Sequence, residues 1–353
     1  METKLIKKLV ETKSLSGDKD NCLKALKIIE TEIKRNNIPV IIKFNNSVPF
    51  LIAGEIDRAS ILFLSHTDVV PARGEQFILK RKGNKLFGRG VLDMKGPMVA
   101  CLNAFIKLWN LGKRDGLFAV TCDEEVGGFN GANFLAKKFF GKIEMAIVAD
   151  GGSGENLIII QKAPFHIKLT AEGKSAHASR PWEGKNAAEN LLKCSKEIIK
   201  EFEGKTNEST TAVLTQFHSG EATNVVPNKA EAIIDMRIKQ ESEVAGLIKM
   251  VETVTKKHGC EWEKIDEPLF FEVKKDNFFI ERWRKIAREI SGKEVELKIE
   301  CAASDARFLW QELKIPVIVT SAIGGGAHGT TEWVDINSLQ RLSETIVKFI
   351  NSL

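Results

Sequence analysis

The sequence of 353 residues lacks several features that mark common classes of protein. None of its six cysteines forms a C-x-x-C pair and most lie in apolar stretches, which argues against a disulfide framework or a thiolate zinc site. No apolar run approaches membrane-spanning length, and residues 1–10 are too charged for a signal peptide. We therefore expect a cytoplasmic protein. Tyrosine is also absent, and we assign no function to that absence.

A strong charge of either sign is missing as well. The formal net charge is +5, and the lysines are interleaved with acidic residues, so we expect neither a nucleic acid nor a membrane as partner. The hydrophobic content of 43% and the charged content of 28% are those of a globular protein. Because a domain typically has roughly 100–200 residues, the length predicts two domains.

Four short runs are apolar almost throughout, as are strands buried on both faces of a parallel sheet. These runs are residues 61–65, 117–121, 146–149 and 316–320. Helical patterns lie between and after them, at residues 96–111, 130–140, 277–291, 305–313 and 338–353. The sequence thus predicts an α/β fold with a mostly parallel sheet flanked by helices.

The middle of the chain has a different order of predicted strands and helices. Between residues 164 and 268 the predicted order is β-α-β-β-α-β, which is the ferredoxin-like pattern. The predicted elements are strands at 165–172, 211–219, 230–238 and 261–266 and helices at 186–203 and 241–259. We interpret residues 164–268 as an inserted lid and dimerisation domain, and residues 1–163 with 269–353 as a discontinuous catalytic domain.

Each of the four apolar runs is followed by residues that can bind metals. His66 and Asp68 follow the first run, Asp123–Glu125 the second, Asp150 the third, and His328 the fourth after a Gly-rich turn. In open α/β sheets, sites form beyond the carboxyl ends of the strands, so these side chains are expected to converge.

Considered alone, each of these residues has an ordinary explanation. A loop histidine beside an aspartate is common without metal, and Asp93 could simply cap the helix that follows it. The triplet Asp123–Glu125 is more specific, because adjacent buried acids repel one another unless cations are present. In a two-metal hydrolase, an acid next to a ligand can deprotonate the attacking water and protonate the leaving amine.

The motifs SHTDVV, GRGVLDMKG, CDEEVGG, GKSAHASRP, ATNVVP, DMR and H-x-x-x-E-W-V occur in this order. Together they resemble the metallopeptidase family of zinc aminoacylase, carboxypeptidase G, acetylornithine deacetylase and succinyl-diaminopimelate desuccinylase. The resemblance implies two Zn²⁺ ions, with Co²⁺ or Mn²⁺ as possible substitutes, bridged by Asp93 before a cis peptide bond to Met94. It implies that His66 and Asp150 complete the ligands of one ion, and Glu125 and His328 those of the other. Asp68 would steady His66, and Glu124 would be the general acid and base.

The resemblance also gives roles to three residues of the inserted domain that would otherwise be interpreted as structural. His177 would donate a hydrogen bond to the tetrahedral oxyanion, acting across the interface of a homodimer. Asn224 and Arg237 would hold the substrate, arginine being suited to a carboxylate.

The resemblance implies hydrolysis of an amide or peptide bond in a small substrate with a free carboxylate. The desuccinylase branch of this family has an arginine and a glycine just before the inserted domain, where this chain has Gln161–Pro164. The same branch has a threonine where this chain has Ala303. The acid after the third run is Asp150, as in peptidases, so a dipeptidase or exopeptidase is favoured over an N-acyl amino acid deacylase. A non-catalytic peptide-binding descendant is the alternative of another class, but such a protein would have no reason to keep Glu124.

Overall fold

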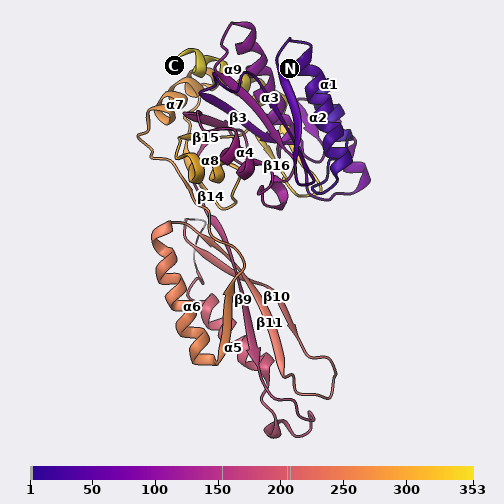
Figure 1. Cartoon of the computed structure of the whole chain (residues 1–353), viewed down its shortest axis with the longest axis vertical. Coiled ribbons are helices and arrows are strands. Elements are labelled where there is room, and N and C mark those ends of the chain that lie inside the picture. The colour runs from indigo at the N-terminus through magenta and orange to yellow at the C-terminus, as the bar shows by residue number, and fades with distance from the viewer. Residues whose placement is uncertain (1–2, 153, 205, 207) are drawn as a thin grey trace. The chain divides into compact units, whose positions relative to one another are not determined.

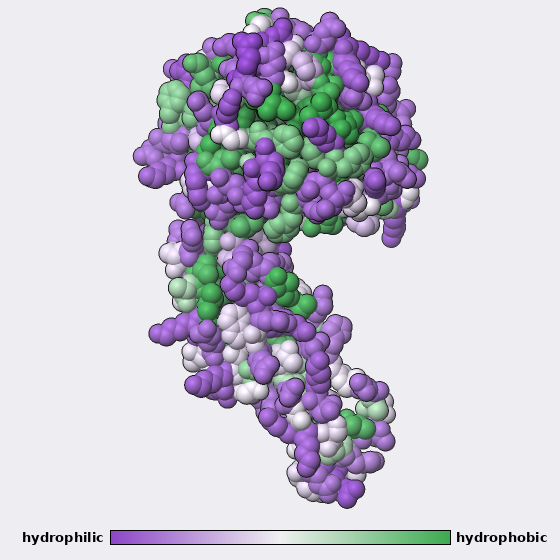
Figure 2. All heavy atoms as spheres, in the orientation of Figure 1, coloured by the Kyte–Doolittle hydropathy of each residue, from purple (hydrophilic) through white to green (hydrophobic). Residues whose placement is uncertain are grey.

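The computed structural model describes residues 3–152, 154–204, 206 and 208–353, which fall into two compact units (Figure 1). Unit 1 comprises Met1–Ile159, Glu272–Lys298 and Ser304–Leu353, and unit 2 comprises Ile160–Phe271 and Ile299–Ala303. Within the described part of the chain, no helix is long and apolar enough to cross a membrane. Figure 2 shows hydrophilic residues over much of the viewed face of each unit.

The centre of the unit 1 sheet consists of four parallel strands in the order β6-β3-β7-β15. These strands are β3 (Ile61–His66), β6 (Gly116–Thr121), β7 (Met145–Val148) and β15 (Val317–Val319). Every residue of β3, β7 and β15 is buried, because helices cover both faces of a parallel sheet. The four apolar runs of the sequence are these four strands.

Antiparallel strands extend this centre on both sides, so the sheet is mixed. β2 (Val48–Ala53) pairs with β6 and with β1 (Val40–Asn45), and β8 (Leu157–Gln161) pairs with β15. β13 (Phe271–Glu272) and β14 (Leu297–Glu300) continue from β8. A separate small sheet contains β4 (Lys80–Lys82), β5 (Lys85–Phe87), β16 (Gly324–Gly325) and β17 (Trp333–Asp335).

The helices of unit 1 are α1 (Thr3–Glu11), α2 (Lys19–Lys34), α3 (Lys95–Asn110), α4 (Ala132–Lys138), α7 (Phe278–Ser291), α8 (Ala306–Leu313) and α9 (Ile336–Asn351). Most of α3 is buried, since it packs against β3, β6 and α9. Its second residue must be glycine, because a Cβ on Gly96 would lie 2.2 Å from the carbonyl oxygen of Val91. That close approach fixes the start of α3 against the loop that carries Asp93.

Among its described residues, unit 2 has a four-stranded antiparallel sheet in the order β10-β11-β9-β12 and two α-helices. Its elements are β9 (Ala163–Glu172), α5 (Ala187–Lys200), β10 (Thr211–Ser219), β11 (Lys229–Ile238), α6 (Val244–His258) and β12 (Cys260–Lys264). Burial alternates along β9 and β11, because one face of the sheet packs on α5 and α6 and the other does not. The chain order is β-α-β-β-α-β, and the predicted fold class is confirmed for both units.

Candidate metal centre

The candidate site lies beyond the carboxyl ends of the parallel strands of unit 1. His66 is the last residue of β3, Asp150 comes two residues after β7, and a short 3₁₀ turn, η2 (Glu124–Val126), follows β6. His328 lies in the loop between β16 and β17, with a backbone φ of 61°. The strands thus bring together residues that are far apart in the sequence.

Five side chains form two groups that share Asp93. In the first group, Nε2 of His66 lies 3.3 Å from Oδ1 of Asp93 and 3.9 Å from Oδ2 of Asp150. In the second, Nε2 of His328 lies 3.1 Å from Oδ2 of Asp93 and 2.9 Å from Oε2 of Glu125. The two oxygens of Asp93 therefore face different groups, as the oxygens of a bridging carboxylate do.

The donor atoms fit two divalent metal ions. Among the described residues, the buried Nε2 of His66 and Oε1 of Glu125 have no hydrogen-bond partner. Burial, together with the nearby charge of Asp93, raises the pKa of Asp150 to about 8, so this set of carboxylates is poorly compensated without cations. Imidazole nitrogen with carboxylate oxygen is a ligand set that suits zinc.

Asp68 is fully buried and organises the segments around it. It lies beside Nδ1 of His66, with Oδ1 at 3.3 Å, so it can hold the ring with Nε2 free to act as a ligand. Its carboxylate also accepts hydrogen bonds from Oγ of Ser16 and from the backbone N–H groups of Glu124 and Glu125. Burial alone would raise the pKa of Asp68, but the hydrogen bonds from His66 and Ser16 hold it below its usual value.

Glu124 lies next to the two groups without belonging to either. Burial raises its pKa well above the usual value for a glutamate; His66 opposes this shift, and the negative charges of Asp150 and Asp305 add to it. A carboxyl group with a raised pKa beside metal ligands is suited to take up and release a proton during catalysis.

Sequence reasoning assigned no role to Glu332, although this residue organises the Asp93 loop. Its Oε2 accepts from Nη1 of Arg89 and N–H of Gly90, both at 2.8 Å, and its Oε1 accepts from N–H of Leu92 and Asp93 at 2.9 and 3.1 Å. Arg89 in turn donates to the carbonyl oxygen of His328 at 3.0 Å. This buried ion pair therefore positions residues of both ligand loops. The glutamate of the H-x-x-x-E-W-V motif was the available signal.

The Asp93–Met94 peptide bond is cis, as the resemblance implied.

Asp305 is a second residue that sequence reasoning did not assign. It is buried at the start of α8, where Oδ2 accepts from Oγ1 of Thr121 at 3.2 Å. Burial raises the pKa of Asp305 to about 7.

The structure places His177 and Asn224 on neighbouring loops of unit 2. An isolated bridge joins His177 to Val225, and the backbone N–H of Ala178 donates to the carbonyl oxygen of Asn224 at 2.8 Å. The His177 side chain is exposed, and its Nδ1 accepts from the backbone N–H of Ser179 at 3.2 Å. This arrangement favours the tautomer with the proton on Nε2, which leaves Nε2 as a donor.

Arg237 lies near the other end of β11. The eight steps from Lys229 to Arg237 span about 26 Å at ~3.3 Å per residue, so within unit 2 this side chain is not beside His177 or Asn224. Its Nε and Nη2 both donate to the carboxylate of Asp235 at 2.9 Å.

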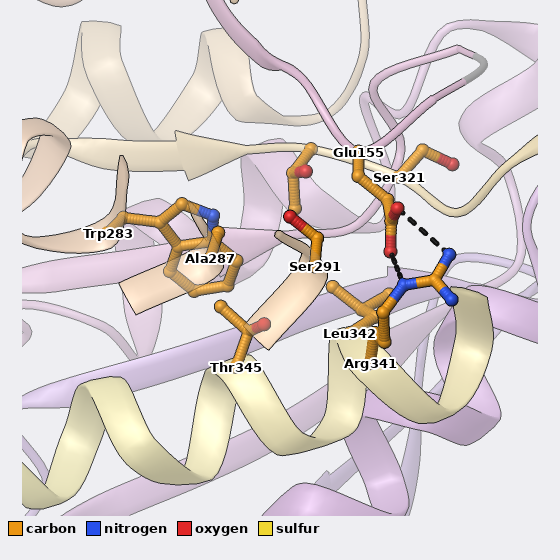
Figure 3. Close-up of a pocket in the computed structure, with 9 residues that line it drawn as sticks. Glu155, Trp283, Ala287, Ser291, Ser321, Arg341, Leu342 and Thr345 are labelled. Carbon is orange, nitrogen blue, oxygen red and sulfur yellow. Dashed lines mark hydrogen bonds and ion pairs between the residues drawn. The ribbon is translucent and has the colours of Figure 1, made fainter. Parts of the chain in front are cut away.

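A pocket elsewhere in unit 1 lies between α7 and α9, where Arg341 donates to Glu155 through Nε and Nη2 (Figure 3). Its volume of about 20 Å³ has room for about one water molecule. This pocket is too small to be the substrate site.

Comparison with known proteins agrees with this geometry. Residues 62–352 match the peptidase family M20/M25/M40. The chain is 26% identical to a succinyl-diaminopimelate desuccinylase of Rickettsia felis over 98% of each chain, and 24% identical to that of Rickettsia bellii over 99% of this chain and 96% of the relative. A tripeptidase from Staphylococcus aureus has a TM-score of 0.80 at 21% identity, covering 98% of this chain and 95% of the other. A metallo-carboxypeptidase from Sulfolobus solfataricus has a TM-score of 0.77 at 16% identity, covering 99% of both chains.

Proposed function

The chain belongs to peptidase family M20/M25/M40, and we propose that it is a two-zinc hydrolase of small substrates that carry a free carboxylate. Membership makes it a metal-dependent hydrolase of amide bonds. The observation that supports the finer proposal is the pair of ligand groups that share Asp93, with Glu124 beside them. A binding protein without catalysis would have no use for an acid in that position. We also propose that the enzyme works in the cytoplasm.

In this proposal, His66, Asp93 and Asp150 hold one ion, and Asp93, Glu125 and His328 hold the other. Two bound zinc ions would polarise the scissile carbonyl as Lewis acids and lower the pKa of the attacking water. Co²⁺ or Mn²⁺ could take their place with the same nitrogen and oxygen ligands.

Glu124 takes the proton of the attacking water and returns it to the leaving amine. Its raised pKa suits both steps, because the carboxylate must accept the proton and the carboxyl must then release it. Asp68 keeps His66 in the tautomer that has a free lone pair on Nε2. Glu332 and Arg89 hold the backbone of Asp93 and His328 in place before substrate arrives.

We further propose that His177 donates a hydrogen bond from Nε2 to the carbonyl oxygen as negative charge develops on it. Unit 2 would form a homodimer, and His177 would serve the site of the partner subunit. Asn224, on the neighbouring loop, would contact the same substrate. Arg237 would bind a substrate carboxylate, for which it would have to exchange or share its bond with Asp235.

The substrate we favour is a dipeptide or other short peptide. Gln161 and Lys162 occupy the segment where the desuccinylase pattern has its arginine, and both are buried. Nζ of Lys162 donates to the carbonyl oxygen of Ser209 at 2.6 Å, so this cation is already engaged within unit 2. The second candidate is an N-acyl amino acid deacylase, which is favoured by the desuccinylase names of the curated relatives.

A substrate panel decides between these candidates. Zinc-loaded protein is incubated with dipeptides, tripeptides, N-acetyl and N-succinyl amino acids, including N-succinyl-diaminopimelate, and amine release is followed. We expect the highest kcat/KM for a peptide. A preference for N-succinyl-diaminopimelate would establish the second candidate, and release from no member of the panel would contradict both.

Subunit complementation tests the proposed dimer. Glu124→Gln and His177→Ala subunits are each expected to be inactive, and they are mixed under conditions that allow exchange. If His177 serves the partner, a mixed dimer contains one site with both wild-type residues and activity returns. Activity that stays at the level of the parents despite proven exchange would contradict action across the interface.

A further inference from the structure

A buried arginine of α8 donates to the turn that carries Glu124, although it belongs to neither ligand group of the proposed metal centre. Arg307 is 7% exposed and lies in the first turn of α8. Its Nη2 donates to the carbonyl oxygen of Gly127 at 2.8 Å, and its Nη1 donates to the carbonyl oxygen of Ser304 at 3.0 Å. Gly127 directly follows η2. One guanidinium group therefore connects the start of α8 to the end of the turn that carries the proposed base.

The other end of η2 is held by Asp68. The backbone N–H groups of Glu124 and Glu125 donate to the Asp68 carboxylate at 3.3 and 3.2 Å. Within the turn, the N–H of Gly127 donates to the carbonyl oxygen of Glu124 at 2.9 Å. Because this short turn is fixed at both ends, the backbone of Glu124 has little freedom to shift relative to the metal ligands on other segments.

Close packing keeps α8 against the residues that follow η2. Gly128 has a φ of 71°, and a Cβ on it would lie 2.3 Å from Oδ1 of Asp305 and 2.8 Å from Cε2 of Phe308. The ring of Phe308 also meets that of Phe129 edge to face, with centroids 5.5 Å apart. The guanidinium group of Arg307 lies over the same ring, with Cζ 4.5 Å from the Phe308 centroid. α8 thus contacts each of the three residues that follow η2.

We propose that Arg307 is a positioning residue for Glu124, whose turn it fixes through the hydrogen bond to the carbonyl oxygen of Gly127. The inference rests on the proposed function, in which Glu124 takes the proton of the attacking water. A general base must lie within ~2.6–3.2 Å of the atom whose proton it takes, so a shift of about 1 Å in the turn would break that contact. Arg307 acts through Glu124 and transfers no proton itself.

The expected effect is bounded by the contribution of Glu124. A misplacement of about 1 Å can cost ~10²-fold in rate, whereas loss of a general base costs ~10²–10⁴-fold. We therefore expect Arg307→Met to lower kcat by about 10–100-fold. KM should change much less, because a displaced base impairs proton transfer in the transition state and leaves the binding of substrate largely intact.

Hydrogen exchange tests the contact without any substrate. The peptide that covers residues 122–128 should exchange faster in Arg307→Met than in the wild type, with and without zinc, because the turn loses the bond that fixes its end. Arg282→Met is the matched control, since Arg282 of α7 also donates to a backbone carbonyl oxygen of unit 1, that of Ser352 at 3.2 Å. This control should leave the exchange of residues 122–128 unchanged. Equal exchange of this peptide in Arg307→Met and the wild type would overturn the proposal.

Arg307→Lys is measured beside Arg307→Met, because it keeps the positive charge and a donor group but loses the two-pronged geometry of the guanidinium. It should change the exchange of residues 122–128 and kcat in the same direction by a smaller factor. If Arg307→Met does not fold, this variant decides, and wild-type values for both quantities would contradict the proposal.

Kinetics of folded, zinc-loaded variants separate positioning from general stabilisation. Urea unfolding and metal analysis establish that each variant is folded and has the metal content of the wild type. Arg307→Met should lower kcat, whereas Arg282→Met should not. In a Glu124→Gln background, Arg307→Met should have little further effect, because the group that it positions is already gone. If Arg307 only stabilised the fold, kcat of the folded enzyme would be unchanged or would fall equally in both backgrounds, and either result overturns the proposal.

These measurements keep the two proposals apart. If the wild-type protein hydrolysed no member of the substrate panel, the proposed function would fail, and the exchange of residues 122–128 would still show whether Arg307 holds the turn. If the wild type is active and Arg307→Met retains its kcat, only the positioning role fails.

Discussion

Replacement of Glu332 by glutamine tests whether this residue supports the metal centre. The two side chains have nearly the same shape, but glutamine has a donor NH₂ group where glutamate has a second acceptor oxygen. In the native protein each carboxylate oxygen accepts two hydrogen bonds, from Arg89 and Gly90 on one side and from Leu92 and Asp93 on the other. Whichever way the amide is oriented, two donors lose their acceptor and face another donor.

The expected cost follows from that count. Hydrogen bonds to a charged group contribute ~1.5–3 kcal/mol each, so losing two of them lowers the free energy of unfolding by about 3–6 kcal/mol. Arg89 is 3% exposed and would also keep its charge without a charged partner. Because Asp93 and His328 are held by this pair, zinc affinity should fall by ~10–100-fold, as for other residues that orient metal ligands.

Two measurements check this prediction. Urea unfolding of chelator-treated protein gives the stability change, and competition with a chromophoric chelator gives the zinc affinity. Glu289→Gln is the matched control, since Glu289 pairs with Lys348 on the surface of the same unit at 2.6 Å and its loss should change little. The reasoning is refuted if Glu332→Gln matches this control in both stability and zinc affinity.

Further outcomes follow from the same site. Glu124→Gln should keep both metals but lower turnover by ~10²–10⁴-fold, whereas Glu125→Gln should lose metal; equal metal content and activity in both would contradict the roles assigned. Hydrogen bonds to Asp93 and Glu125 raise the pKa of His328 to about 10, and burial raises that of Asp150 to about 8. Burial lowers the pKa of His66, but hydrogen bonds to Asp68 and Asp93 outweigh it and hold this pKa well above its usual value, so zinc binding at pH 7 should release between about two and three protons. Calorimetry in buffers of different ionisation enthalpy measures this release, and a value of zero would count against the ligand assignment. Burial raises the pKa of Asp305 to about 7, above the unfolded value of ~3.9, so its contribution to stability is complete at low pH and is lost as pH rises through 7. In metal-free protein, Asp305→Asn should flatten the fall in urea stability between about pH 4 and 7, and an unchanged slope would refute this.

Local patterns in the sequence were enough to predict the elements that position the site. β3 is apolar up to Ser65 and β7 is apolar throughout, and both were identified as buried parallel strands, because a strand covered on both faces needs no polar alternation. The strands of unit 2 were predicted from the β-α-β-β-α-β order, and β9 alternates between buried and half-buried residues, as a sheet covered on one face does. The rule that sites form at the carboxyl ends of parallel strands then predicted that His66, Glu125 and Asp150 converge.

Contacts between distant segments could not be predicted in this way. The small sheet pairs β5 with β17, whose residues are far apart in the chain, and neither short strand has a periodicity of its own. Glu332 bonds to Leu92 across 240 residues, so its role depends on a pairing that no local pattern encodes.

Asp68 and Glu332 both accept hydrogen bonds from backbone N–H groups of loops at the site. A short loop after a buried strand or before a buried helix has backbone N–H groups that find no partner within the loop, and leaving them unpaired is costly. Asp68 accepts from the N–H groups of Glu124 and Glu125, and Glu332 accepts from those of Leu92 and Asp93. In both cases a buried carboxylate from another segment fixes the backbone of a proposed ligand or base. The ligand positions are thereby set by the fold itself, so metal binding does not have to provide the free energy of ordering these loops.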